Sequence, residues 1–247
     1  MNKYMVREIR WNTHHNINFD NNRDENYRFF YQNQFTTPSI YYKENSFNDF
    51  KVLVDPRDIS GKDKIVLQSF APSKDNQYLA YSFNRNGSDW REIQIVSTSN
   101  QGSPTESLKD VRFSGINWFR NGFYYTKYPP SSITEKLGKP AIYYHRLFTD
   151  QAEDSLVFKS PNPNDELHLY SNFDETIFVL EVENRIDHQH SYFYYDPTEE
   201  IKAFRPLFYK VNFSLTFVAY KNGQLIMRAA SGGKTQLVTI DKKAPGD

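Results

Sequence analysis

The chain has 247 residues, its 30 lysines and arginines are balanced by 30 aspartates and glutamates, and it contains no cysteine. The formal net charge of zero gives no electrostatic reason to expect nucleic acid or an anionic membrane as a partner. The absence of cysteine excludes disulfides, thiolate metal sites and a cysteine nucleophile. The 18 tyrosines and 20 phenylalanines favour strands over helices, because aromatic side chains suit a pleated, half-buried surface, so the composition predicts an all-β fold.

Residues 1–26 are polar, and we expect them to form an N-terminal extension that is partly irregular. No apolar run in the sequence has the length of a signal peptide or of a membrane span. We therefore expect a protein located in the cytoplasm or the periplasm, with no signal peptide in this chain.

Residues 27–247 are expected to form one domain of consecutive strands. The first strands are predicted at 27–31, 39–42 and 51–54, and they form an incomplete unit. Four hairpins of one plan follow, each with an apolar strand, a polar turn and an aromatic or aliphatic strand, at 65–71 with 78–83, 111–118 with 123–126, 167–171 with 177–180, and 215–220 with 224–227. A third strand follows each hairpin, at 92–97, 142–148, 191–195 and 235–240, and fourth strands are expected at 155–159 and 207–211.

The turns of these hairpins recur at a long and regular spacing. With Asp75, Asn121, Asp174 and Asn222 as their markers, successive turns lie 46, 53 and 48 residues apart. Two of them are Asn-Gly pairs, which favour tight hairpins because both residues tolerate positive φ. A repeat of about 40 to 50 residues with four strands is typical of a β-propeller blade. The sequence therefore predicts a β-propeller fragment of about four to five blades; the alternative is an antiparallel β-sandwich, whose turns recur about every 8 to 12 residues.

Two sequence runs carry a specific resemblance. The run APSKDNQYLAYS at 71–82, followed by RNGSDWREI at 85–93, resembles the second propeller blade of prolyl oligopeptidases, where the pattern is Ser-Pro-Asp-Gly-Lys-Tyr-Leu-Ala-Tyr and then Gly-Ser-Asp-Trp. The resemblance continues through VRFSGINW at 111–118, GFYYTKYP at 122–129 and IYYHRL at 142–147. It implies an incomplete N-terminal propeller, with about four to five of an expected seven blades, from a serine peptidase. The α/β-hydrolase domain that carries catalysis in this family has no counterpart in these residues.

The sequence contains no catalytic serine motif. A Gly-x-Ser-x-Gly elbow presents the nucleophile of an α/β-hydrolase, and the closest runs here, Gly87-Ser88-Asp89 and Gly102-Ser103-Pro104, each lack a glycine. Serine beside glycine in a loop more often forms a turn. We predict no catalytic residue in this chain, and we expect the chain alone to be inactive.

Neither a metal nor another cofactor is expected. His188 and His190 stand at alternate positions, as two metal ligands on a strand can, but no third ligand follows at a suitable spacing. His145 and His168 are interpreted as strand residues whose ring nitrogens are satisfied by backbone groups. No glycine-rich phosphate loop is present.

The resemblance also implies roles for a few residues. Phe113 takes the place of an aromatic residue that lines the pocket for substrate residues preceding the proline, although it could instead pack between sheets. Asp89, Trp90 and Arg91 form a loop that resembles one facing the hydrolase domain. The loop 184–187 matches another propeller loop near the pocket.

These implications give a specific functional hypothesis. The chain would be the substrate-gating domain of an endopeptidase that cleaves short peptides after proline, and its partners would be the hydrolase domain of the same parent protein and short proline-containing peptides. The alternatives are a non-enzymatic propeller that binds other proteins, and a truncated, inactive paralogue.

Overall fold

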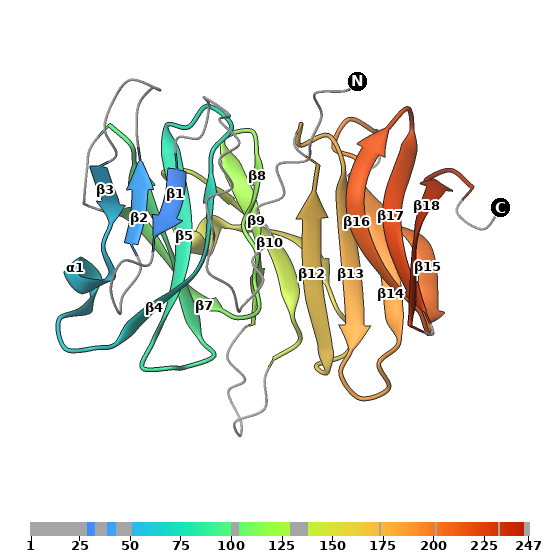
Figure 1. The fold of residues 1–247 in the computed structure, drawn as a ribbon, viewed down its shortest axis with the longest axis horizontal. Coiled ribbons are helices and arrows are strands. Elements are labelled where there is room, and N and C mark those ends of the chain that lie inside the picture. The colour runs from blue at the N-terminus through green and yellow to red at the C-terminus, as the bar shows by residue number, and fades with distance from the viewer. Residues whose placement is uncertain are drawn as a thin grey trace. The chain divides into compact units, whose positions relative to one another are not determined.

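The computed structural model describes residues 29–32, 39–42, 51–99, 104–128, 138–172, 174–200, 202–231 and 233–244, which form mainly β-strands (Figure 1). The predicted N-terminal extension lies outside the described residues. The chain divides into two compact units, Met1–Lys109 and Asp110–Asp247. None of the helices in the described ranges is long and apolar enough to cross a membrane.

The first unit contains two sets of consecutive antiparallel strands. The first set is β1 (Phe29–Gln32), β2 (Ser39–Tyr42) and β3 (Lys51–Val54). Helix α1 (Pro56–Ser60) follows, and its first turn is capped by the Asp55 carboxylate, which accepts a hydrogen bond from the Arg57 backbone N–H at 2.9 Å. The second set is β4 (Ile65–Pro72), β5 (Tyr78–Arg85), β6 (Arg91–Ser97) and β7 (Pro104–Val111), the last of which continues into the second unit.

The second unit repeats the same plan three times. Its first set of strands is β8 (Asn117–Phe119), β9 (Gly122–Lys127), β10 (Ala141–Arg146) and β11 (Ser155–Lys159), with a 3-10 turn at Gln151–Glu153. The next is β12 (Asp165–Ser171), β13 (Phe178–Asn184), β14 (His190–Tyr195) and β15 (Arg205–Val211). The last is β16 (Ser214–Lys221), β17 (Gln224–Ser231) and β18 (Lys234–Asp241). One pairing, Val111 with Lys127, joins β7 to β9.

Apolar side chains fill the space between neighbouring sheets in each unit. In the second unit, successive residues of β13 belong to two cores: Phe178 lies in one with Tyr124 of β9, and Val179 lies in the other with Leu225 of β17. The Phe178 and Tyr124 rings meet edge to face, with centroids 4.9 Å apart. Aromatic residues therefore contribute to packing between sheets.

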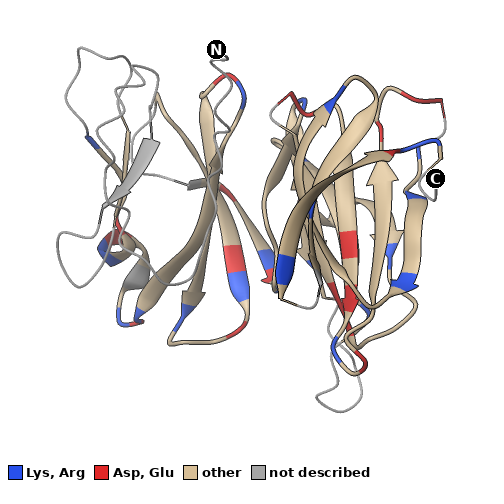
Figure 2. Ribbon diagram, turned by 45° about the vertical axis from the view of Figure 1, so that its right-hand side comes forward, with Lys and Arg blue, Asp and Glu red and all other residues tan. Residues whose placement is uncertain are grey.

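Charged side chains of both signs are interspersed along the strands and turns of each unit (Figure 2). This distribution agrees with the neutral charge balance of the whole sequence.

The predicted strand 111–118 is wrong in its middle. β7 ends at Val111 and β8 begins at Asn117, with irregular backbone between them. Within the interruption Phe113 adopts left-handed backbone, with φ of 48°, and Asp110 near the end of β7 is also left-handed, with φ of 58°. The residue pattern does not indicate β7 as the fourth strand of its set, because its residues, PTESLKDV, are largely polar.

Only one of the two Asn-Gly turns has the predicted backbone. Asn222 and Gly223 form the two-residue loop of the β16–β17 hairpin, with φ of 52° and 81°. In the β8–β9 hairpin, the loop is Arg120-Asn121 and the left-handed residue is Arg120, with φ of 53°. Gly122 is already the first residue of β9, and its role is steric: an added Cβ would lie 2.1 Å from the His145 carbonyl oxygen.

Substitution Gly122→Ala should destabilise the protein by about 2 kcal/mol, because β9 and β10 would have to separate to admit the methyl group. Urea unfolding followed by circular dichroism measures this change. The matched control is Gly115→Ala, where a Cβ would have no neighbour closer than 3.5 Å, and we expect it to change the unfolding free energy by about 0.5 kcal/mol or less. Equal effects of the two substitutions would contradict the steric explanation.

Candidate functional site

The segment between β7 and β8 is strained and firmly held. A left-handed φ of 48° at Phe113 is unusual for a bulky residue and costs about 1–3 kcal/mol. The next residue fixes the segment to β9, because the Ser114 hydroxyl accepts a hydrogen bond from the Thr126 N–H at 2.8 Å and donates one to the Gly115 carbonyl at 2.6 Å. The residue that follows Phe113 is thus tied to a neighbouring strand by one side-chain hydrogen bond.

Phe113 itself is half-buried. Its ring meets the edge of the Tyr128 ring, with centroids 6.3 Å apart and an interplanar angle of 77°. The Arg112 guanidinium lies 4.7 Å from the Phe113 ring centroid, within cation–π range. Phe113 therefore combines packing against one aromatic residue with partial exposure of its ring, which is compatible with either role considered for it from the sequence.

Tyr128 follows β9 and is fully buried. Its backbone N–H donates a hydrogen bond to the Asp110 carbonyl at 3.0 Å, near the end of β7. Its hydroxyl, in contrast, has no hydrogen-bond partner in the described part of the chain. A buried polar group without a partner costs about 1–3 kcal/mol. Burial, with a smaller contribution from Glu166, raises the pKa of the phenol to about 12, although Arg185 and Arg112 act to lower it.

The predicted interface residues Asp89, Trp90 and Arg91 lie together in the β5–β6 hairpin of the first unit. Asp89 is exposed and the Trp90 side chain is 41% exposed. The hairpin loop is ordered by its own hydrogen bonds, since Asn84 Nδ2 donates to the Ser88 carbonyl at 2.8 Å and the Trp90 N–H donates to Ser88 Oγ at 3.1 Å. The loop thus presents a large aromatic side chain on a fixed backbone.

The loop 184–187 joins β13 to β14 and is ordered in a similar way. Asn184 Oδ1 accepts hydrogen bonds from the N–H groups of Ile186, at 2.9 Å, and Asp187, at 3.3 Å. Ile186 is 73% exposed at its tip.

The histidines are paired with carboxylates. His188 Nδ1 lies 3.6 Å from Glu183, and His190 Nδ1 lies 3.0 Å from Glu181. His145, expected to be satisfied by backbone groups, has a carboxylate partner: its Nδ1 lies 2.7 Å from Asp154, and both side chains are buried. Within the described ranges, no three His, Cys, Asp or Glu side chains are grouped as metal ligands.

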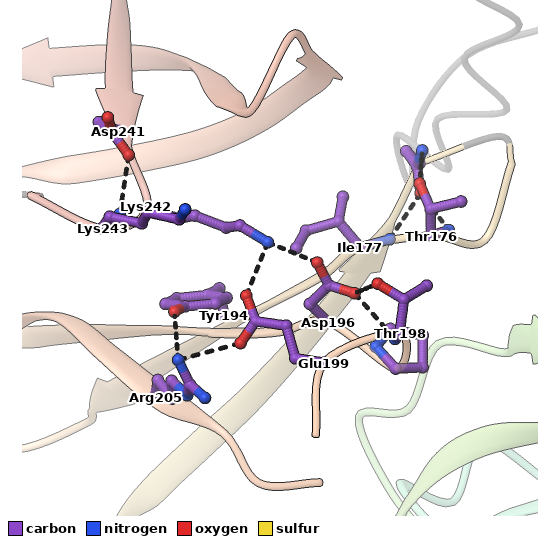
Figure 3. Close-up of polar contacts among 12 residues, drawn as sticks. Thr176, Ile177, Tyr194, Asp196, Thr198, Glu199, Arg205, Asp241, Lys242 and Lys243 are labelled. Atoms are coloured by element: carbon purple, nitrogen blue, oxygen red, sulfur yellow. Dashed lines mark hydrogen bonds and ion pairs between the residues drawn. The ribbon is translucent and has the colours of Figure 1, made fainter. Parts of the chain in front are cut away.

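A buried ion cluster connects the end of β18 to the segment between β14 and β15 (Figure 3). Lys242 Nζ contacts Asp196 and lies 2.9 Å from Glu199, whose other carboxylate oxygen lies 3.0 Å from Arg205. Lys242 and Asp196 are 8% and 7% exposed. Nothing in the sequence pattern indicates this cluster, because its members lie far apart along the chain.

Hydrogen bonding within the cluster determines its protonation. Burial acts to raise the pKa of Asp196, but hydrogen bonds from Lys242 and Thr198 outweigh it and hold that pKa below its ordinary value. Burial acts to lower the pKa of Lys242, but hydrogen bonds to Asp196 and Glu199 raise it above its ordinary value. Both groups are therefore charged at neutral pH. Because the two cations of the cluster, Lys242 and Arg205, are paired with its two carboxylates, we interpret the cluster as structural.

Substitution Lys242→Met should lower the unfolding free energy at pH 7 by about 3 kcal/mol, because Asp196 would be left buried without its cation. Urea unfolding measures the loss, and Lys243→Met, at an exposed neighbour, is the matched control with little expected effect.

The same pair predicts a pH dependence. Because the pKa of Asp196 is lowered by folding, its contribution is present above the ordinary value of 3.8 and is lost as the pH falls through the lowered value. Between about pH 5 and about pH 2, the wild type should therefore lose more stability than Lys242→Met. Parallel pH profiles would contradict this assignment.

Comparison with known proteins gives a consistent family. The family model described as prolyl oligopeptidase, N-terminal beta-propeller domain, matches residues 9–247. A prolyl endopeptidase from Elizabethkingia miricola is 30% identical over 165 residues, which cover 64% of this chain and 23% of the relative. Prolyl oligopeptidase A from Galerina marginata is 28% identical over 190 residues, which cover 64% of this chain and 26% of the relative.

Solved structures share the fold. Prolyl oligopeptidase B from Galerina marginata, bound to a 25mer macrocyclization substrate, superposes with a TM-score of 0.76 at 17% identity, over 87% of this chain and 34% of that chain. Oligopeptidase B from Leishmania major gives a TM-score of 0.70 at 14% identity, over 89% of this chain and 32% of that chain. The predicted fold class, a partial β-propeller, is thereby confirmed. The chain spans about a quarter to a third of the length of these proteins.

Proposed function

Because the chain belongs to the prolyl oligopeptidase family, through its N-terminal β-propeller domain, we propose that it is the substrate-gating domain of a serine endopeptidase that cleaves short peptides after proline. The observation that carries the proposal is the family match over 9–247. Its partners would be an α/β-hydrolase domain of the same parent protein and short proline-containing peptides.

Gating is a steric function in this proposal. A hydrolase active site enclosed by a rigid propeller is reached by an unstructured peptide but not by a folded protein, and the enclosure also excludes water. The described sheets suit this role, since their facing surfaces are filled by large buried side chains such as Phe178 and Tyr124. Tight packing of this kind resists deformation.

Phe113 is proposed to contact the substrate residues that precede the proline. Support comes from its half-exposed ring and from its strained backbone, which is held in place by Ser114 and Thr126. Strain of this kind accumulates at ligand-binding positions, where a fixed geometry is useful. An aromatic face also binds apolar side chains and proline rings without demanding a particular sequence.

Asp89, Trp90 and Arg91 are proposed to contact the hydrolase domain. Trp90 is 41% exposed on an ordered loop, and rigid aromatic residues of this kind are common anchors of protein interfaces. Asp89 and Arg91 would supply polar contacts around it.

Substitution Phe113→Ala should weaken binding of a short peptide about tenfold, because the loss of one aromatic contact is worth about 1.4 kcal/mol. The measurement is fluorescence anisotropy of a labelled, proline-containing hexapeptide titrated with the 247-residue chain. Tyr209→Ala, which removes a 67% exposed aromatic side chain from β15, is the matched control with unchanged affinity. Equal affinities of wild type and Phe113→Ala would reject the contact.

The chain alone should not hydrolyse a proline-containing chromogenic peptide above the buffer rate, because its sequence has no Gly-x-Ser-x-Gly elbow. A parent protein whose reading frame includes an α/β-hydrolase should cleave the same peptide after proline. A parent protein that binds the peptide but does not cleave it would favour the alternative, a propeller with a purely binding role.

A further inference from the structure

Several other buried hydroxyls of the second unit are hydrogen-bonded, and the Tyr128 hydroxyl differs from them. The Ser114 hydroxyl donates to a backbone carbonyl, and the Tyr125 hydroxyl donates to Asp154 at 2.7 Å. The Tyr192 hydroxyl donates to Glu181 at 2.8 Å. Tyr128, fully buried, has no such partner for its hydroxyl in the part of the chain that the structure describes. Because buried polar groups are nearly always hydrogen-bonded, this hydroxyl requires an explanation.

Neither of the two nearby acids accepts a hydrogen bond from this hydroxyl. Asp165 influences the Tyr128 phenol electrostatically, but its two carboxylate oxygens already accept hydrogen bonds from Ser160 and Asn184. Glu166 also influences the phenol, and its carboxylate lies 3.9 Å from His168. The phenol is therefore surrounded by charged residues and remains a protonated donor without an acceptor.

The position of Tyr128 is fixed on two sides. Its backbone N–H donates to the carbonyl of Asp110, a left-handed residue near the end of β7, and its ring packs against Phe113, the left-handed residue between β7 and β8. The partnerless donor therefore lies beside the one aromatic residue already proposed to contact a peptide. A donor that is held in place before the ligand arrives loses little entropy on binding.

We propose that Tyr128 is a second peptide-binding residue, whose hydroxyl donates a hydrogen bond to a main-chain carbonyl of the peptide residue that packs against Phe113. This inference rests on the proposed function, because it concerns the same site. The hydroxyl is closed to solvent in the peptide-free chain, so a side chain that covers it has to move as the peptide enters.

The chemistry of the site favours a carbonyl as the acceptor. The phenol is protonated at neutral pH and so donates a hydrogen bond, which requires an acceptor such as a carbonyl oxygen. Every peptide residue carries a main-chain carbonyl, so this hydrogen bond is available whatever the substrate sequence. The hydrogen bond would thus fix the peptide backbone while Phe113 contacts its side chains.

Substitution Tyr128→Phe tests the inference because it removes only the hydroxyl. The affinity of the 247-residue chain for the labelled hexapeptide should fall about fivefold, which corresponds to about 1 kcal/mol. In the same variant the thermal midpoint without peptide should rise by about 2–4 °C, since the partnerless hydroxyl is gone. Tyr209→Phe, at an exposed tyrosine, is the matched control and should change neither quantity.

A modified peptide identifies the acceptor. Replacing the carbonyl of each residue before the proline by a thioamide, a weaker acceptor, should lower the affinity of the wild type at one position and should have no such effect there in Tyr128→Phe. This comparison isolates the one hydrogen bond from other effects of the substitution.

The outcomes separate the two proposals. If wild type binds the hexapeptide and Phe113→Ala weakens binding, but Tyr128→Phe binds with wild-type affinity, the inference about Tyr128 is wrong and the proposed function stands. A lower thermal midpoint in Tyr128→Phe would show that the hydroxyl has a structural partner, which also overturns the inference. If the wild type does not bind the hexapeptide, both proposals fail for this chain.

Discussion

Each inner sheet of the second unit must be covered by other strands on both of its faces, and the rest of the unit depends on this constraint. The first five residues of β13 are all buried, because one face of that strand packs toward β9 and β10 and the other toward β16, β17 and β18. Such a strand admits a polar residue only if its polar atoms are satisfied. Glu181 meets this requirement by accepting hydrogen bonds from Tyr192, at 2.8 Å, and Tyr170, at 3.2 Å, while His190 contacts it at 3.0 Å.

The segment around Phe113 differs from the β13 interior in two respects. It contains a bulky residue in left-handed backbone, and it adjoins a buried hydroxyl that lacks a partner within the described residues. Elsewhere in the same unit, buried polar groups have partners: Glu181 accepts a hydrogen bond from Tyr192, and Lys242 is paired with Asp196. Local exceptions in an otherwise consistent structure are characteristic of functional sites, and this contrast connects the architecture to the proposed peptide site.

The sequence predicts the class and repetition of the fold well, because they follow from local patterns. Asn222-Gly223 forms the tight turn that its composition indicates, and most predicted strands differ from the observed ones only at their ends. Asn121-Gly122 is misleading, because its glycine is required by the approach of the His145 carbonyl, a contact between different strands. The long predicted strand 111–118 fails at Phe113, whose backbone is left-handed and whose neighbour Ser114 is hydrogen-bonded to Thr126 of β9.

The candidate site is only partly accessible from the sequence. Phe113 and the Trp90 loop are suggested by family resemblance, whereas the Tyr128 hydroxyl and the Lys242 cluster depend on contacts between distant segments. No pattern in a single sequence encodes such contacts.

Amide NMR of the 247-residue chain, with and without a saturating proline-containing hexapeptide, tests the central claim most directly. The account predicts that the largest chemical-shift changes fall on the amides of residues 110–116 and 126–128. Changes spread evenly over the chain, or concentrated on strands remote from Phe113, would contradict it.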